Sequence, residues 1–411
     1  MNSVSALADP FIIPNPYPTY AALRGSCSVH WITELNAWGA FSYETCMRTL
    51  RDQRFLANRM DEVLQSKFPR EALKDDHIYC RFTKNTMMYS DGAVHTALRN
   101  STRAAFNSEC HVHYAEVIKR VAEELVAEIP SGTQELDAVS NLTFHMPVRA
   151  AVQPFGVPKE DLGFILPRVE MIISFFPGPK DQPTSFAEVT TALEELHTYA
   201  LELVQGRRGE VPSGTVIARL VESQPEQTET TLQQTIHQLV LLLIALFAPT
   251  TPGSLSSGLL AFLKDRDQIA VHKREDSARL NTADEIFRYN ASNQFTWRVA
   301  QEDVELDGKL VLKGHLVVAF LGAANRDPLK FVDPDRFLIS RQNSGEHLSL
   351  GAGAHACLGR RIATYEINCF FDALFRRFPN IALAGEPVWN SNLEFRALRS
   401  LPVSLGTRKA V

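Results

Sequence analysis

One cysteine in a glycine-rich stretch is the residue of this chain with the most evident chemistry. The stretch GAGAHACLG covers residues 351–359 and holds Cys357, with Gly351 and Gly359 at its ends and His355 two places before the thiol. Glycine lets a backbone turn sharply or lie against a flat partner, and the residues that follow have helical periodicity. Cys357 is therefore predicted just before or at a helix N-terminus, where the helix dipole and free N–H groups lower a thiol pKa. Such a thiolate could serve as a nucleophile or a soft metal ligand, and the alternative is a buried structural cysteine.

The elements that must position this cysteine are mostly helical. Apolar residues recur at spacings of three and four in residues 114–129, 185–205, 230–264, 283–289 and 360–378. Strand patterns occur at 29–32, 38–41, 295–300 and along 304–320, where a D-G pair predicts a hairpin turn. The sequence therefore predicts an α+β fold, predominantly helical, with a long central helix and small β-sheets.

The composition is that of an ordinary globular protein. Of 411 residues, 45% are hydrophobic and 22% charged, and the net charge of -5 argues against nucleic acid as a partner. No repeat or low-complexity stretch marks a linker, so one domain over residues 1–411 is expected. The opening residues lack a signal-peptide pattern, and the most apolar run, 239–247, is too short to cross a bilayer. Six scattered cysteines without a C-x-x-C pair fit a reducing cytoplasm, and we expect a monomer that binds no membrane.

The wider stretch HLSLGAGAHACLGRRIATYE resembles the cysteine-ligand loop of the cytochrome P450 superfamily, an aromatic residue followed by G-x-G-x-H-x-C-x-G. Leu350 stands where the family usually has phenylalanine. By this resemblance Cys357 would be the proximal thiolate ligand of a haem b, and His355 would bond a haem propionate. Gly351 and Gly359 would let the loop approach the cofactor. The resemblance implies the cytochrome P450 fold, in which the long helix crosses the distal face of the haem.

Further family segments follow in the expected order. EIFR matches the family's E-x-x-R, whose spacing puts Glu285 and Arg288 on one helix face. FVDPDRF supplies Arg336, which by the resemblance completes their ion network. In isolation such charges would more often form a solvated surface pair.

Three other residues would bind haem propionates by the same resemblance. Arg298 lies in QFTWRVA, where the family has a propionate-binding arginine, and MMYSDGAVHTALRNSTRAAF resembles the helix entry that supplies His95 and Arg99. Those two residues lie four apart, on one face of a helix. The resemblance covers nearly the whole chain and is closest to bacterial members that receive electrons from a ferredoxin and its reductase. Arg360 and Arg361 could meet such an acidic partner, and a solvated pair is the alternative.

The long helix departs from the family pattern. Where members usually have an acid and a threonine over the haem, this chain reads Leu-Phe-Ala-Pro-Thr, with Phe247 at the usual glycine, Pro249 at the acid and Thr250 at the threonine. Proline lacks an N–H and clashes with the preceding turn, which predicts a kink. It also has no titratable group for the proton delivery that conventional oxygen activation requires. Phe247 would narrow the space above the iron, or it simply fills the core.

Two stretches, ALFAPTTPGSLSSG and RYNASNQFTWRVA, are similar to the bacterial P450s that nitrate aromatic amino acids, as in thaxtomin biosynthesis. The resemblance implies that nitric oxide and O2 together nitrate tryptophan or tyrosine, free or peptide-bound, for a natural product. One alternative is a hydroxylase or oxidative-coupling enzyme that receives protons through Thr250, Thr251 or the substrate. Another is a non-catalytic haem sensor of nitric oxide. A hydrolytic role for Cys357 is disfavoured, because no general base with an orienting partner is evident.

A zwitterionic substrate needs donors for its carboxylate, an acceptor for its ammonium and aromatic or apolar contacts for its ring. For the charged and aromatic candidates, a surface, second-layer or core role is the alternative. The candidate donors are Arg59, Tyr89, Asn293 and Thr296, the candidate acceptor is Glu394, and the candidate ring contacts are Phe175 and Phe176.

Overall fold

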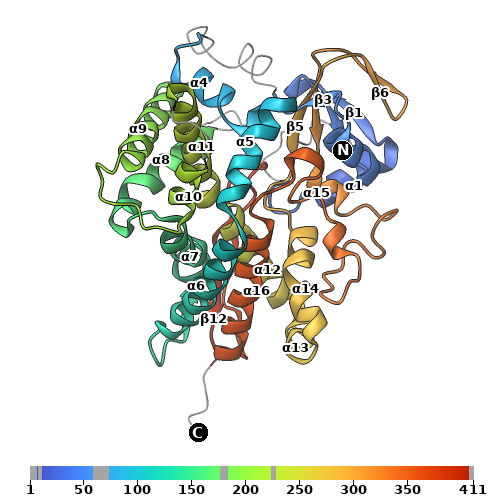
Figure 1. Ribbon diagram of the computed structural model, residues 1–411. Coiled ribbons are helices and arrows are strands. Elements are labelled where there is room, and N and C mark those ends of the chain that lie inside the picture. Colours follow the sequence, from blue (N-terminus) through green and yellow to red (C-terminus); the bar gives the residue numbers. More distant parts are fainter. Residues whose placement is uncertain (1–6, 8–11, 59–73, 176–183, 224–227, 407–411) are drawn as a thin grey trace.

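The structure, a computed structural model, describes residues 7, 12–58, 74–175, 184–223 and 228–406. Its body is helical, with α8 to α11 grouped on one side and a sheet beside the N-terminal helix on the other (Figure 1). The α-helices are α1 Tyr17–Ser26, α2 Tyr43–Arg51, α4 Ile78–Lys84, α5 Gly92–Ala105, α6 Ser108–Ala127, α7 His145–Phe155, α8 Leu162–Phe175, α9 Phe186–Val204, α10 Val216–Glu222, α11 Glu229–Phe247, α12 Thr250–Lys264, α13 Asp267–Arg274, α14 Asp276–Tyr289, α15 Leu321–Ala324 and α16 Arg360–Arg377.

The strands form small sheets, as predicted. The largest has the order β1-β2-β8-β5-β3, in which β2 and β8 are parallel and the other pairs antiparallel. The others are β10-β11, β4-β12-β9 and the hairpin β6-β7. The strands are β1 Val29–Ile32, β2 Ala37–Ala40, β3 Phe55–Leu56, β4 Glu135–Asp137, β5 Thr296–Ala300, β6 Val304–Leu306, β7 Lys309–Val311, β8 Leu316–Ala319, β9 Ala382–Leu383, β10 Val388–Trp389, β11 Leu398–Ser400 and β12 Pro402–Ser404.

The D-G turn is confirmed by the backbone of the β6-β7 hairpin. Asp307 has φ 50° and Gly308 φ 73°, the left-handed values that a two-residue hairpin turn requires at both positions. The stretch predicted as strand-like from 304 to 320 is thus three strands, because β8 continues after the hairpin into the large sheet.

The central core lies where α16 packs on α6, α6 on α7, and α12 on α14 and α16. Large aromatic side chains fill it: Tyr114, Phe155, Phe262, Phe370 and Phe371 are all almost completely buried. Apolar burial of this extent is the main driving force for the fold. It packs α12 against α16, the helix that begins three residues after Cys357.

The long central helix is broken rather than kinked. The predicted helix at 230–264 consists of α11 and α12, separated at Ala248, whose φ of -61° and ψ of 151° are extended. A residue before proline is pushed out of the helical region, and Pro249 cannot donate the next helical hydrogen bond. Residues 229–264 are apolar and long enough to cross a membrane by composition, but 67% of their most apolar window is buried inside the protein, as in a core helix.

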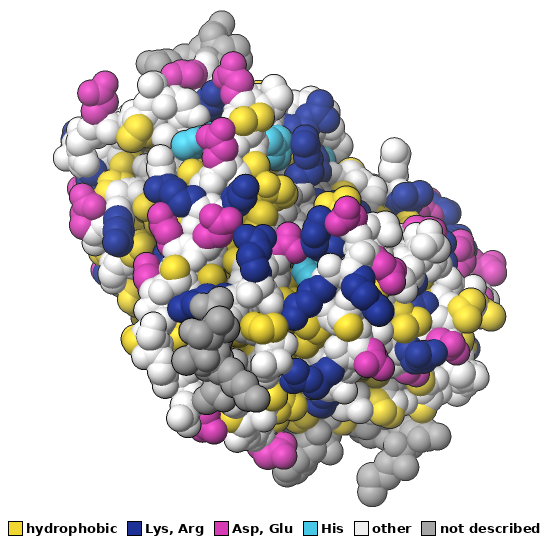
Figure 2. All heavy atoms as spheres, turned by 90° about the horizontal axis from the view of Figure 1, so that it is seen from below, with side chains coloured by type: hydrophobic (Ala, Val, Ile, Leu, Met, Phe, Trp, Pro, Cys, Tyr) yellow, Lys and Arg dark blue, Asp and Glu magenta, His cyan; other side chains and the backbone are white. Residues whose placement is uncertain are grey.

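The surface carries both signs of charge. Figure 2 shows one face on which Lys and Arg are interspersed with Asp and Glu. This mixture agrees with the small net charge of the chain, -5.

Candidate functional site

The cysteine loop is closed by its own backbone. The Cys357 N–H donates to the Leu350 carbonyl at 2.7 Å, and α16 begins three residues later at Arg360. Gly351 and Gly353 have φ of +70° and +71°, which L side chains rarely adopt. A Cβ on Gly353 would lie 2.9 Å from the Leu50 carbonyl oxygen. Glycine is therefore required where this loop passes α2, and Cys357 stands just before α16, as predicted.

The thiol is exposed, yet enough protein surrounds its sulfur that burial raises its pKa. The backbone N–H groups of Gly359 and Arg360 and the Arg99 and Arg360 charges act in the opposite direction. The N–H groups at the helix N-terminus thus lower this pKa, as predicted, but desolvation outweighs their effect, so the pKa is raised. Donors aimed at the sulfur still fit a thiolate that a metal ion would keep deprotonated.

Basic side chains from α5 meet the cysteine loop. The rings of His95 and His355 have centroids 4.1 Å apart, and the Arg99 Nη2 donates to the Ala356 carbonyl at 2.6 Å. His95 is 4% exposed, and its Nε2 has no hydrogen-bond partner within the described ranges. Burial, His355 and Arg99 lower the pKa of His95 to about 4. An orphaned polar atom beside an arginine fits an anionic partner such as a haem propionate.

Asp91, which the sequence analysis did not identify, also contacts His355 of the cysteine loop. Its carboxylate lies 3.4 Å from the His355 Nε2 and accepts hydrogen bonds from the N–H groups of Ala57 and Asn58.

Arg298 lies in β5, 5% exposed, and its Nη1 donates to the Trp297 carbonyl at 2.7 Å. Its propionate role stays a prediction.

The E-x-x-R pair forms a fully buried ion pair. The Arg288 Nε and the Glu285 Oε2 are 2.7 Å apart, and neither side chain is exposed to solvent. Arg288 also donates to the carbonyls of Asn325, Pro334 and Arg336. Because the Leu348 N–H donates to the Asn325 side chain at 2.7 Å, the network leads directly to the cysteine loop.

The third member of the network is Arg341, and the prediction of Arg336 is wrong. The Arg341 Nε lies 3.3 Å from the Glu285 carboxylate, whereas the Arg336 side chain is exposed and only its carbonyl takes part. Both arginines lie in the same loop sequence. The turn at Asp333, whose φ is 47°, and the path of the following backbone decide which one points inward.

Near the helix break, Phe247 ends α11 at 8% exposed and Pro249 precedes α12 without a side-chain cap. Thr250 and Thr251 form the first turn of α12 and are half-buried. The local sequence Leu-Phe-Ala-Pro-Thr-Thr contains no carboxylate. The structure thus provides hydroxyl groups but no acid at this point.

Two of the predicted substrate segments are brought together. Asn293 pairs with Phe395, and the Gln294 N–H donates to the Glu394 carbonyl at 2.8 Å. Asn293 Oδ1 is buried and has no hydrogen-bond partner within the described residues, and Glu394 is 7% exposed. Thr296 begins β5 a few residues on. Their contact with a substrate stays a prediction.

Of the remaining substrate candidates, two pack against other aromatic rings and two lie outside the described residues. Tyr89 is 4% exposed in a short 3-10 turn and packs near Phe82. Phe175 packs against Phe186 with ring centroids 6.1 Å apart, which favours the core role. Arg59 and Phe176 lie outside the described residues.

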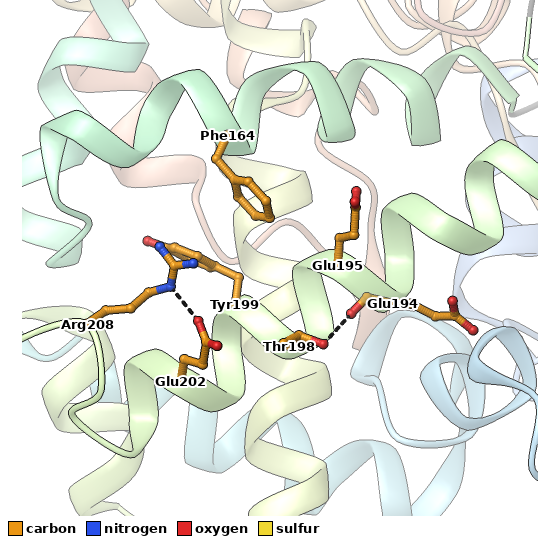
Figure 3. A pocket seen from close by; sticks show the side chains of 7 residues that line it. All are labelled: Phe164, Glu194, Glu195, Thr198, Tyr199, Glu202 and Arg208. Carbon is orange, nitrogen blue, oxygen red and sulfur yellow. Dashed lines mark hydrogen bonds and ion pairs between the residues drawn. The ribbon is translucent and has the colours of Figure 1, made fainter.

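A separate surface pocket lies between α8 and α9 (Figure 3). Arg208 occupies its edge, with its Nε 2.8 Å from the Glu202 carboxylate and its guanidinium over the Tyr199 ring. None of its lining residues belongs to the cysteine loop or to the predicted site. It is lined by Phe164, Glu194, Glu195, Thr198, Tyr199, Glu202 and Arg208.

A cysteine on a glycine loop, beside Arg99 and a buried histidine whose Nε2 has no partner among the described residues, fits the site of a haem-thiolate protein. Within the described ranges, no group of three or more His, Cys, Asp or Glu side chains could hold a metal ion. Comparisons with known proteins agree. The family described as Cytochrome P450 matches residues 280–402, which include the buried ion pair and the cysteine loop.

The similarity to individual proteins extends along the whole chain. The 6-deoxyerythronolide B hydroxylase of Saccharopolyspora erythraea is 29% identical, over 95% of this chain and 96% of its own. The cytochrome P450 monooxygenase PikC of Streptomyces venezuelae is 28% identical, over 95% and 91%. The crystal structure of P450BioI in complex with hexadec-9Z-enoic acid ligated acyl carrier protein has a TM-score of 0.85 and 26% identity, and the match covers 97% of this chain and 99% of that one. This chain is thus similar to cytochrome P450 proteins along almost its whole length, and proteins of that family bind haem as their cofactor.

Proposed function

We propose that this P450 nitrates the ring of tryptophan or tyrosine, free or peptide-bound, with O2 and nitric oxide in the biosynthesis of a natural product. The observation that carries the proposal is the break between α11 and α12, where Ala248 is extended and Pro249 stands in place of an acid. Efficient oxygen protonation needs a titratable group within hydrogen-bond reach. A site without one favours a reaction that requires fewer protons.

The proton and electron balance separates the candidate reactions. Nitration joins an aromatic C–H, nitric oxide and O2 with one electron and one proton, and gives a nitroarene and water. Hydroxylation of the same C–H consumes O2, two electrons and two protons. The electrons used per product therefore identify the reaction independently of the product's mass.

The residues would divide the work as follows. Cys357 would bind the iron of haem b, and His95, Arg99, Arg298 and His355 would bond its propionates. When bound, haem supplies the redox chemistry with O2.

On the distal side, Phe247 would restrict the space above the cofactor, and Thr250 and Thr251 would offer hydroxyl groups. Asn293, Thr296, Tyr89 and Arg59 would orient the substrate carboxylate, and Glu394 its ammonium. Phe175 and Phe176 would lie near its ring.

The second candidate is a hydroxylase or oxidative-coupling enzyme for a similar natural product. Relatives named as a hydroxylase and a monooxygenase favour it, since both are similar to this chain along almost its whole length. In that case Thr250, Thr251 or the substrate would carry protons. A haem sensor of nitric oxide without turnover is the third.

We also propose a single P450 domain over residues 1–411, a monomer in the cytoplasm that binds neither membrane nor nucleic acid. A ferredoxin and its reductase would supply electrons. Arg360 pairs with Asp284 at 3.1 Å, so Arg361 is the freer of the two proposed docking charges.

The test uses the purified haem-loaded protein with ferredoxin, its reductase, O2 and a nitric oxide donor. Tryptophan, tyrosine, phenylalanine and short peptides are first screened by the shift of the Soret band. Products of the ligands that bind are then measured against electrons consumed. A nitro product at one electron per turnover is expected. Hydroxylated products at two electrons would overturn nitration, and no product despite ligand binding would favour the sensor.

A further inference from the structure

Two buried serines join α12 to the segment 291–296, which leads into β5 and carries proposed substrate residues. The hydroxyl oxygens of Ser254 and Ser292 are 3.1 Å apart, and the two residues are 2% and 5% exposed. Ser254 lies in the second turn of α12, and Ser292 directly precedes Asn293. The pair therefore connects the helix that begins at the break with the segment 291–296.

The direction of these hydrogen bonds follows from the number of protons. The Ser254 Oγ–H donates to the Thr250 carbonyl at 2.9 Å. A hydroxyl has one proton to give, so Ser292 must donate to the Ser254 oxygen. The order is then Ser292 to Ser254 to Thr250, a chain that ends on the first residue of α12.

This first turn has little other support at its start. Pro249 gives α12 no side-chain cap, and Ala248 is extended. A serine hydroxyl that bonds the carbonyl four residues back often bends a helix, so the Ser254 hydroxyl affects the geometry of this first turn. At Gly253, α12 also lies very close to the segment 291–296. A Cβ on Gly253 would lie 2.8 Å from the Ser292 hydroxyl oxygen.

The segment that contains Ser292 makes backbone hydrogen bonds to residues 394–396. The Ser292 carbonyl accepts the Arg396 N–H at 2.8 Å, and Gln294 bonds the Glu394 carbonyl. The Asn290 amide donates to the Ser257 carbonyl of α12 at 3.2 Å. Ser292 and Asn290 therefore both make hydrogen bonds to residues of α12.

We infer that Ser254 and Ser292 are a positioning pair. Their hydrogen bond sets the first turn of α12 relative to the segment 291–296, and it thereby sets the positions of the Thr250 and Thr251 hydroxyls. The pair affects how many of the electrons consumed form product and how many are lost to hydrogen peroxide. This inference rests on the proposed place of the helix break above the haem. Neither serine touches the reacting atoms in this assignment.

The experiment compares Ser254→Ala, Ser292→Ala and the double variant with Ser256→Ala. Ser256 is the matched control: it is 1% exposed and lies in the same helix, but its hydroxyl bonds the Gly253 carbonyl, at 3.2 Å, and no other group of the described residues. Haem content, the Soret band, the ligand-induced Soret shift, product and peroxide per electron are measured. Each single variant should lose about fivefold in product per electron, the effect of one lost buried hydrogen bond, with haem content unchanged.

The double variant should be no worse than either single one, because both remove the same interaction. Additive losses, or an equal loss in Ser256→Ala, would overturn the inference. Peroxide per electron is measured in the presence of any ligand that shifts the Soret band. The pair can therefore be tested even if the product is hydroxylated rather than nitrated, and a failure of the nitration proposal is distinguished from a failure of the pair.

Discussion

The Arg341 guanidinium lies 3.3 Å from the Glu285 carboxylate, which is already paired with Arg288 at 2.7 Å. One fully buried carboxylate thus pairs with two arginines, which together carry one positive charge more than it balances. The two guanidinium groups also donate hydrogen bonds to carbonyls of the loop that leads to the cysteine. Arg341 itself donates to the Asp333 carbonyl at 3.0 Å. The network therefore fixes α14 against this loop.

Removal of the central carboxylate should unfold or strongly destabilise the protein. Glu285→Gln leaves two buried guanidinium groups without a counter-charge, and a loss of about 3–5 kcal/mol in the free energy of unfolding is expected. Glu128→Gln removes the partner of Arg149 in an exposed pair and should cost at most about 1 kcal/mol. Urea unfolding of both variants measures the difference. Equal effects would contradict a structural role for the buried network.

The choice between two arginines of one loop gives a direct comparison. Arg341→Ala should lower stability by about 3 kcal/mol and reduce haem content, because it leaves Glu285 with one cation and Asp333 without its donor. Arg336→Ala should change stability by less than about 0.5 kcal/mol, since only the Arg336 carbonyl is used. Thermal unfolding and the Soret absorbance per protein report both effects. The reverse order would restore Arg336 to the network.

Gly353 should tolerate no side chain. With φ of +71° and a Cβ position 2.9 Å from the Leu50 carbonyl oxygen, Gly353→Ala must move the cysteine loop or α2. A loss of about 2–4 kcal/mol and a weaker Soret band are expected. Gly132→Ala is the control for backbone strain alone, because Gly132 has φ of +91° and nothing within 4 Å. That variant should lose only about 1 kcal/mol and keep its haem.

His237 makes the protein less stable in acid. Burial, together with His197 and Arg81, lowers the pKa of this histidine from 6.5 to about 4, although the hydrogen bond with the Gln233 carbonyl acts in the opposite direction. Between pH 6.5 and 4 the unfolded chain takes up a proton that the folded chain refuses, so stability falls as pH falls through this window. The loss reaches up to about 3 kcal/mol.

His237→Leu should remove this part of the pH dependence. The variant and the native protein are compared by urea unfolding at pH 7.5, 6.0 and 5.0. Their free energies should converge, or cross in favour of the variant, as pH falls. Parallel curves would show that His237 does not titrate in this range.

An acid at the helix break should redirect the reaction. Pro249→Glu places a carboxyl beside Thr250 and restores a backbone N–H, so proton delivery becomes possible. We expect less nitrated product and more peroxide or hydroxylated product per electron. Pro252→Ala relieves a second proline in the same turn without adding an acid and should leave the product ratio unchanged. No change in Pro249→Glu would contradict the role given to the missing carboxylate.

The features that depend on local chain chemistry were open to prediction from the sequence. The turn at Asp307 and Gly308, the glycine loop before α16 and the helix interruption at Pro249 all follow from what glycine and proline allow at their own positions. Helical periodicity likewise located α9 and α16 to within one residue at each end, whereas it missed the first six residues of α6.

Only the tertiary structure decided which side chains meet across the fold. Arg341 rather than Arg336 reaches Glu285, Asp91 reaches His355, and Ser292 reaches Ser254. These pairs are 38 or more residues apart, and their partners are chosen by how intervening loops turn and pack. The pKa of Cys357 was decided in the same way, because desolvation depends on all the atoms around a sulfur and not on the helix that follows it.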